Sequence, residues 1–282
     1  MLRLIAACAG ALIATSAVAQ DAALLERGSY LVNAVMACDG CHTPRGPAGL
    51  DMTRRFSGGF QVWDEPEFLV RGSNISQDRE TGIGGWTAND VKRLLTEGKR
   101  PNGVTVAHQM PYPFYKILTP RDLDAVAAYV LSVPAVRNQV PAPVYRKPAH
   151  VALIPGAEKP FSEDMLKDTV KRGFYLGTIA HCMECHARRP DGRADYVKWN
   201  GKGGYVFKTP KGTVTTKNIS SHKAAGVGAW TDAELKRALT HGVDRTGRPF
   251  GLQMQRQIYF SKMTDQDLDA IVAWVRTIPP IE

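Results

Sequence analysis

The pattern Cys-x-x-Cys-His occurs twice in this chain, at Cys38–His42 and at Cys182–His186. It is the attachment signature of c-type haem, in which two thiols bond the porphyrin and the histidine after them binds the iron. The two copies use every cysteine of the chain except Cys8. The pattern therefore predicts two covalently bound haem c groups, attached through Cys38, Cys41, Cys182 and Cys185, with His42 and His186 as axial ligands.

Two other uses of four cysteines agree less well with the sequence. An exported protein could pair them in two disulfides, but disulfides do not explain the histidine that follows each pair. A zinc site built from two Cys-x-x-Cys pairs usually has them roughly 15–20 residues apart, whereas these pairs are separated by the length of a domain. The sequence therefore favours haem over disulfides and zinc.

A larger segment around each motif is also duplicated. Matching residues recur at an offset of 144, as in Asn74-Ile75-Ser76 with Asn218-Ile219-Ser220. Towards both ends the offset becomes 145, as in Arg27-Gly28 with Arg172-Gly173 and Asp122-Leu123 with Asp267-Leu268. Tandem duplication predicts two domains, at residues 20–149 and 150–282. The prolines between them predict an extended connector at about 134–160, which could wrap one domain.

Each repeat is expected to be a small helical domain. A first helix is predicted over residues 22–35 and 162–179. The later helices begin at threonines followed three residues on by an acid, as in a capping box, at Thr87, Thr119, Thr231 and Thr264. The chain between each haem motif and the second helix is rich in glycine and proline and is expected to be irregular. The predicted fold class is therefore all-α.

The final helix of each repeat is expected to bury one apolar stripe. Tyr129 and Trp274 hold equivalent places on these helices. We expect them to pack against the first helices near Gly28 and Gly173.

The sixth iron ligand decides the chemistry of each haem, because a vacant position can bind small molecules and a second protein ligand favours electron transfer. Met110 and Met254 lie in matched register, each 68 residues after its histidine, and are the predicted ligands. A methionine–histidine pair raises the reduction potential. His108, two residues before Met110, competes for the first iron.

Other residues are expected in supporting places. Backbone carbonyls around Pro47 and Pro190 are the expected hydrogen-bond acceptors for the axial histidine rings. Four further histidines have no partner in the other repeat and are expected at the surface: His150, His181, His222 and His241.

The N-terminus has the features of a secretory signal peptide over residues 1–19. Arg3 is followed by an apolar stretch and by the cleavage pattern Ala17-Val18-Ala19. A membrane anchor is the alternative, but the stretch is short against the roughly 20 apolar residues that a span needs. Cys8 would be removed with this segment. We therefore expect an exported, periplasmic protein.

The formal net charge of +9 fits docking to an acidic protein or an anionic membrane surface, and it equally fits simple solubility. We find no cluster of Lys and Arg interleaved with aromatic residues in the sequence, so no nucleic acid partner is expected.

An ordered set of residues resembles the multihaem cytochrome c subunits of bacterial periplasmic dehydrogenases for alcohols, sugar acids and aldehydes. The set is Cys-x-x-Cys-His, Asn74-Ile75 with Asp78, Thr81-Gly82-Ile83-Gly84-x-Trp86, Met110-Pro111-Tyr112 and Leu118-Thr119-x-x-Asp122. The second repeat departs from it, with His222, Ala225 and Gln255 where the first has Asp78, Thr81 and Pro111. Many such subunits have three haem motifs, and this chain has two.

The resemblance implies two tandem class I cytochrome c domains and a function in electron transfer. It implies a periplasmic dehydrogenase catalytic subunit as electron donor and a terminal oxidase or another cytochrome as acceptor. An enzyme such as a dihaem peroxidase or a thiosulfate dehydrogenase is the alternative. Such an enzyme needs a vacant or displaceable iron position, against which the matched methionines speak. No further constellation of nucleophile, base or metal ligands occurs in the sequence.

Overall fold

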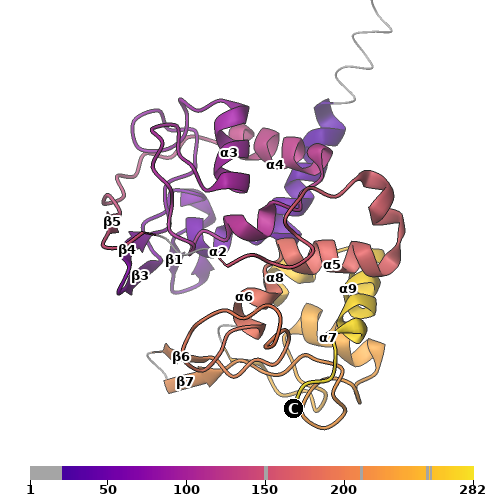
Figure 1. Ribbon diagram of the computed structural model, residues 1–282. Coiled ribbons are helices and arrows are strands. Elements are labelled where there is room, and N and C mark those ends of the chain that lie inside the picture. Colours follow the sequence, from indigo (N-terminus) through magenta and orange to yellow (C-terminus); the bar gives the residue numbers. More distant parts are fainter. Residues whose placement is uncertain (1–20, 149–151, 210–211, 252–253, 255) are drawn as a thin grey trace, which may run out of the picture.

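The computed structural model describes residues 21–148, 152–209, 212–251, 254 and 256–282 (Figure 1). The predicted signal peptide, at residues 1–19, lies outside the described residues. The first repeat forms the upper part of the molecule in Figure 1 and the second repeat the lower part. Among the described residues, no helix has the length and apolar character needed to cross a membrane.

The first repeat begins with a helix over residues 21–30. Its further elements are η1 (Leu31–Val35), α2 (Asp39–His42), β1 (Arg45–Gly46), β2 (Gly49–Leu50), η2 (Met52–Arg54), β3 (Val62–Glu65), β4 (Phe68–Arg71), α3 (Ala88–Glu97), η3 (Tyr112–Tyr115) and α4 (Pro120–Ser132). Strand β5 (Val144–Tyr145) follows in the connector.

The second repeat has η4 (Glu163–Lys167), α5 (Thr169–Ile179), α6 (Cys182–His186), β6 (Val206–Thr209), β7 (Gly212–Thr215), α7 (Asp232–His241), α8 (Gln257–Phe260) and α9 (Asp265–Thr277). The helix predicted over residues 162–179 is thus divided. The division falls at Asp168, whose side chain caps α5 by accepting a hydrogen bond from the Lys171 amide.

The all-α prediction is wrong, because three small antiparallel sheets accompany the helices. Strands β3 and β4 form a hairpin in which Glu65 pairs with Phe68, and β6 and β7 form its counterpart. In β4, Phe68 and Val70 are buried while Leu69 and Arg71 are partly exposed, the alternation of a half-buried strand. The stretch after each haem motif, expected to be irregular, therefore contains a strand pattern that its glycines and prolines obscured.

The predicted helix starts are confirmed. The Thr87 hydroxyl accepts a hydrogen bond from the Asp90 amide, and the Asp90 carboxylate accepts one from the Thr87 amide. Thr231 and Glu234 form the same capping box at α7.

The close crossing of the first and last helices is confirmed in both repeats. A Cβ atom on Gly28 would lie 2.0 Å from the Ala125 carbonyl oxygen and 2.7 Å from the Tyr129 Cβ. At Gly173 the corresponding distances are 1.8 Å to the Ala270 oxygen and 2.8 Å to the Trp274 Cβ. Only glycine permits this approach, so these two glycines set the helix spacing.

The connector does wrap one domain, the first. Strand β5 pairs with β4, and the Val136 carbonyl accepts hydrogen bonds from the side chains of Asn74 and Ser76. The boundary near residue 150 stays a prediction.

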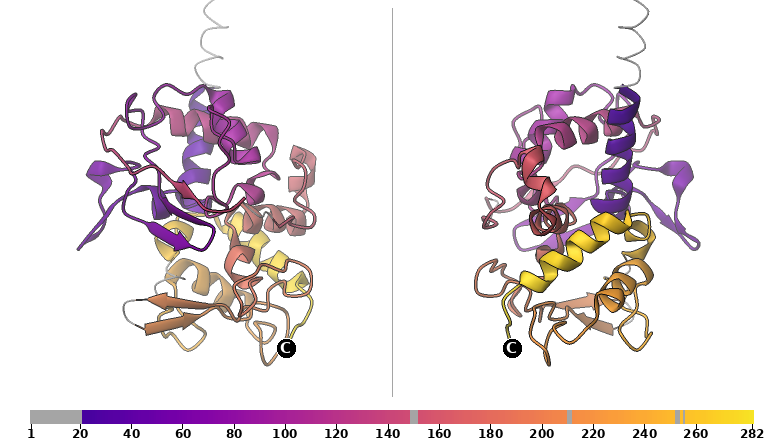
Figure 2. Two further views of the ribbon diagram at one scale, coloured as in Figure 1. Left: turned by 60° about the vertical axis from the view of Figure 1, so that its left-hand side comes forward. Right: turned by 90° about the vertical axis from the view of Figure 1, so that its right-hand side faces the viewer.

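The two repeats share one apolar core and a reciprocal set of polar contacts. Asp122 of the first repeat pairs with Arg27 of the same repeat and accepts a hydrogen bond from the Tyr175 hydroxyl of the second. Asp267 of the second repeat pairs with Arg172 and accepts a hydrogen bond from the Tyr30 hydroxyl of the first. Figure 2 (right) shows the lower end of the indigo first helix against the yellow α9.

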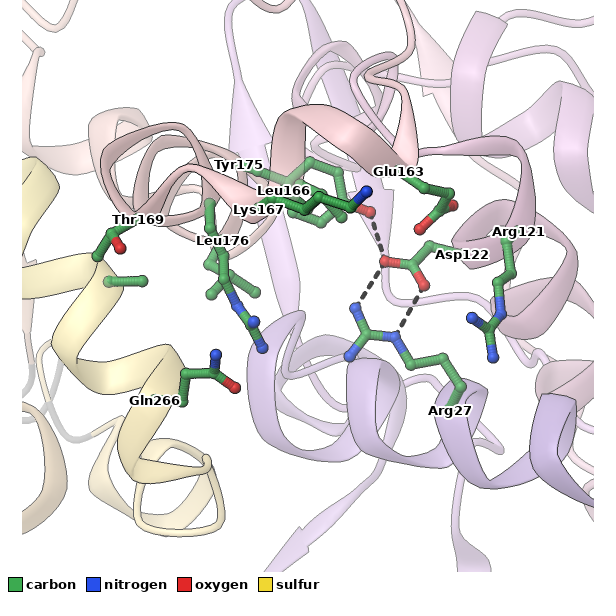
Figure 3. Close-up of a pocket in the computed structure, with 12 residues that line it drawn as sticks. Arg27, Arg121, Asp122, Glu163, Leu166, Lys167, Thr169, Tyr175, Leu176 and Gln266 are labelled. Carbon is green, nitrogen blue, oxygen red and sulfur yellow. Dashed lines mark hydrogen bonds and ion pairs between the residues drawn. The ribbon is translucent and has the colours of Figure 1, made fainter.

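A cavity of about 590 Å³ lies between the repeats, next to these contacts. Figure 3 shows the Arg27–Asp122 ion pair and the Tyr175 hydroxyl at its wall. None of the eight predicted haem-binding residues lines this cavity, so it is distinct from the haem sites.

Candidate haem-attachment sites

Both haem motifs form one short helical turn, α2 or α6, which brings the two thiols of each pair to the same side of the chain. The residue before each Cys-x-x-Cys-His motif has a left-handed backbone, with φ of 56° at Ala37 and 47° at His181. This conformation is costly for residues other than glycine, and its recurrence shows that both motifs are entered in the same way.

None of the four cysteines of the two motifs is paired in a disulfide. Each keeps some accessible surface but is surrounded by protein, and this burial raises the pKa to about 12 for Cys38 and Cys185 and to about 11 for Cys41 and Cys182. A thiol–disulfide exchange site would instead need a lowered thiol pKa.

Each predicted axial histidine is held by a backbone carbonyl. The Nδ1 atom of His42 lies 2.8 Å from the Ser73 oxygen, and that of His186 lies 2.8 Å from the Lys217 oxygen. Because a carbonyl can only accept, Nδ1 carries the proton and Nε2 keeps its lone pair for a metal. Burial lowers the pKa of both histidines, partly opposed by this hydrogen bond, so the neutral, ligating form is favoured.

The carbonyls expected near Pro47 and Pro190 are thus not the acceptors. The true acceptors directly precede the duplicated Asn-Ile-Ser segments. The Asn74 side chain accepts a hydrogen bond from the Ser76 amide (3.0 Å), and the Asn218 side chain accepts one from the Ser220 amide (2.8 Å). This Asx turn fixes the chain next to each acceptor, which explains why the segment is matched in the two repeats.

A glycine packs against each acceptor carbonyl. The Gly58 amide donates to the His42 carbonyl (2.7 Å) and the Gly203 amide to the His186 carbonyl (2.8 Å). Their φ angles are 70° and 71°, and a Cβ on Gly203 would lie 2.5 Å from the Lys217 oxygen. No larger residue fits here without moving the histidine or its acceptor.

The two predicted methionine ligands occupy matched turns. The Met110 amide donates to the Ala107 carbonyl and the Met254 amide to the Gly251 carbonyl, both at 3.0 Å. Each methionine carbonyl then accepts a hydrogen bond at 2.7 Å from the amide two residues on. The equivalence of the two turns agrees with equal roles, and iron ligation by both methionines stays a prediction.

His108, the competing ligand, is half-buried against Phe68 of strand β4, with ring centroids 5.2 Å apart and planes at 76°. Among the described residues its buried Nδ1 has no hydrogen-bond partner. Burial lowers its pKa.

The two motifs are anchored differently. Asp39 is buried and accepts hydrogen bonds from Arg55 and Thr43 of its own repeat. In the second motif the acid is Glu184, one position later, and it lies 2.7 Å from the Nδ1 of His181.

His181 was expected at the surface, and this is wrong. Its side chain is only 10% exposed, and its ring lies edge-on to Phe114 of the first repeat and 3.3 Å from a guanidinium nitrogen of Arg256. The first repeat has no histidine at the equivalent position, so the sequence gave no sign of the interface that buries His181.

His222 takes the hydrogen-bonding role in its turn that Asp78 has in the first repeat. Its Nδ1 accepts hydrogen bonds from the Ala224 and Ala225 amides, as Asp78 does from the amides of Glu80 and Thr81. The departure from the family pattern therefore preserves the turn.

Taken together, a free cysteine pair on one turn and a histidine with its Nε2 available fit covalent haem c in both repeats. The comparisons with known proteins agree. Residues 170–279 match the cytochrome c family.

Relatives extend the similarity to nearly the whole chain. The fructose dehydrogenase cytochrome subunit of Gluconobacter japonicus is 28% identical over 90% of this chain and 52% of its own length. The gluconate 2-dehydrogenase cytochrome c subunit of Pantoea cypripedii is 27% identical over 91% and 60%. A diheme cytochrome c-type protein of Cereibacter sphaeroides is 29% identical over 87% and 83%. The chain thus spans a little over half the length of the dehydrogenase subunits.

Proposed function

Because this chain contains a cytochrome c domain and is similar to cytochrome subunits of dehydrogenases, we propose that it is a dihaem electron-transfer subunit. It would bind two haem c groups, accept electrons from a dehydrogenase catalytic subunit and pass them to a terminal oxidase or another cytochrome. The relatives are named as cytochrome subunits, in agreement with an electron-transfer role rather than an enzymatic one.

The observation that carries this proposal is the matched pair of histidine–carbonyl hydrogen bonds. His42 with Ser73 and His186 with Lys217 have the same atoms, the same sequence separation and the same distance. A metal-ligating histidine is usually oriented in this way, by a carbonyl that accepts a hydrogen bond from its other ring nitrogen. Haem supplies a one-electron redox centre when bound, and its chain ligands are proposed to be His42 with Met110 and His186 with Met254.

Export to the periplasm is part of the proposal. It is supported by the predicted signal peptide at residues 1–19 and by the covalent haem motifs. Fractionation of native cells tests whether the positive charge also brings the protein to a membrane surface.

The test is a haem count with spectroscopy. Pyridine haemochrome analysis should give two haems per chain, and one in a Cys182→Ala/Cys185→Ala variant. The ferric protein should show a methionine-to-iron charge-transfer band that Met110→Ala and Met254→Ala each reduce by about half. A high-spin ferric haem that binds cyanide in the unaltered protein, or turnover of peroxide or thiosulfate, would overturn the proposal.

A further inference from the structure

Charge distinguishes the two repeats at equivalent places. Residues 187–223, after the second haem motif, include nine lysines and arginines and two acids, whereas residues 43–79 include five of each. The segments are structurally comparable, because Val62 pairs with Arg71 in one hairpin and Val206 with Thr215 in the other. The positive excess of the protein is therefore concentrated beside the second haem motif.

Five residues of this segment form what we call the cationic cluster: Arg189, Arg193, Lys198, Trp199 and Lys202. The Arg189 guanidinium carbon lies 5.9 Å and the Lys202 Nζ 4.5 Å from the centroid of the Trp199 ring, within cation–π distance. The ring is itself fixed, because Trp199 Nε1 donates a hydrogen bond to the Gly203 carbonyl (2.6 Å). Arg189 and Lys202 are thus held against a fixed ring.

The acids of the segment neutralise only part of this charge. Asp191 pairs with Arg193 at 2.8 Å and with Arg189 at 4.0 Å. Asp195 accepts hydrogen bonds from the amides of Val197 and Lys198, and the bond from Lys198 is the main cause of its lowered pKa. Over the described ranges, Lys198 and Lys202 have no ion-pair partner.

The cationic cluster is linked to the second haem motif by the hydrogen bonds of Gly203. Gly203, which fixes Trp199 through its carbonyl, donates its amide to the His186 carbonyl. Lys217, whose carbonyl holds the His186 ring, has an exposed side chain. A partner bound at the cluster would therefore lie against the chain that carries this haem.

We propose that the cationic cluster is a docking site for an acidic protein surface, which makes the second repeat the one that contacts an acidic redox partner. The inference rests on the proposed function. The ammonium groups of Lys198 and Lys202, which no acid of the described residues pairs, can attract carboxylates of a partner. Tryptophan and arginine are enriched at the centres of protein interfaces. The neighbouring Val197 is 71% exposed, an apolar contact that favours a protein over a lipid headgroup.

The cationic cluster is not apparent from the sequence. Its cations are spaced over fourteen positions, from Arg189 to Lys202, and the fold brings the two outermost, Arg189 and Lys202, to the Trp199 ring.

The test uses the holoprotein and an acidic flavodoxin as probe. Binding to immobilised flavodoxin is measured against salt concentration for Lys198→Glu/Lys202→Glu and, as a milder change, Lys198→Gln/Lys202→Gln. The control is Arg79→Glu/Arg93→Glu, which makes the same charge change at exposed positions of the first repeat. Anionic vesicles of phosphatidylglycerol are tested in parallel.

At low salt we expect the Glu variant to bind the flavodoxin about tenfold or more weakly, the Gln variant to lie between, and the control to change less than about twofold. The difference should fade at about 1 M salt, where charges are screened within about 3 Å. Equal loss in variant and control, or loss of vesicle binding alone, would overturn the docking site. Charge-dependent binding by a protein whose haems exchange no electrons would contradict the proposed function and leave the docking site standing.

Discussion

At the scale of single residues, the two haem motifs differ in the acid between their cysteines. Asp39 is tied to Arg55 by two hydrogen bonds, of 2.9 and 2.8 Å, inside the first repeat. Glu184 faces His181 at the interface between the repeats. The first motif is therefore anchored within its own repeat, and the second is anchored to the contact between the two.

We expect Asp39→Asn to destabilise the protein by about 3 kcal/mol, because it removes one partner of a largely buried ion pair. The Asp39 side chain is 6% exposed and that of Arg55 23%. Urea unfolding of the holoprotein measures the change. Asp64→Asn, which breaks an exposed pair with Arg146, is the control and should cost less than about 1 kcal/mol.

Gly203→Ala should disturb His186, the predicted axial ligand of the second haem. The new Cβ would lie 2.5 Å from the Lys217 oxygen, so the carbonyl must move from the His186 ring. Gly247→Ala is the matched control, since its φ is also positive, at 87°, but nothing lies within 4 Å. Both variants should lose about 1 kcal/mol from backbone strain, and only Gly203→Ala should also shift the potential of one haem. Identical potentials in the two variants would count against the role given to this glycine.

At this scale the sequence predicts side chains better than backbone. The cysteines and histidines predicted to bind haem come from a motif, whereas the acceptor carbonyls of Ser73 and Lys217 have no side-chain signature. The matched Asn-Ile-Ser segments marked the place, but only the fold shows that it lies next to each histidine.

At the scale of elements, the register shift between the repeats has a structural explanation. The offset changes from 145 at Leu31 to 144 at Cys38, so the first repeat has one extra residue between these points. It is absorbed in η1, a π-helix over Leu31–Val35, as one-residue insertions in helices often are. The second repeat needs no such turn, and α5 is α-helical there.

The sequence showed the extra residue but not where the chain would accommodate it. The hairpins were missed for a different reason, since turn-forming glycines and prolines around four-residue strands resemble a loop. The capped helices were predicted correctly because their signals, Thr87 with Asp90 and Thr231 with Glu234, are local.

Gly173→Ala should destabilise the protein, although alanine has a higher helix propensity than glycine. In an open helix this change stabilises by about 1 kcal/mol, but here a Cβ would lie 1.8 Å from the Ala270 oxygen on α9. We expect a net loss of about 2 kcal/mol or more, because α5 and α9 must separate. Thermal or urea unfolding gives the sign. Gly85→Ala, where no atom lies within 4 Å, should have little effect, and a stabilised Gly173→Ala would contradict the close crossing.

At the scale of the whole molecule, the tyrosines that cross between the repeats make stability sensitive to alkaline pH. Burial and then Asp267 raise the pKa of Tyr30 from 10.0 to about 12, and burial and Asp122 raise that of Tyr175 well above its usual value. A raised pKa means that the folded protein favours the protonated hydroxyl. Its contribution to stability is complete below pH 10 and is lost as pH rises through 12.

The free energy of unfolding should therefore fall between pH 10 and 12, and Tyr30→Phe should flatten part of this fall. Urea titrations at several pH values measure it. Tyr145→Phe, at an exposed position on β5, should keep the slope of the unaltered protein. An unchanged slope in Tyr30→Phe would show that other groups cause the alkaline loss.

The reciprocal Tyr–Asp contacts have the form of a homodimer interface, in which each copy offers the same residues to the other. Here both copies are encoded in one chain. In a true homodimer a single mutation alters both halves of such an interface at once, whereas Asp122 and Asp267 can change separately. That freedom let the two repeats diverge. Met183 stands at the position equivalent to Asp39, and lysines stand at the positions equivalent to acids of the first hairpin. The Tyr–Asp contacts that join the repeats have stayed symmetric.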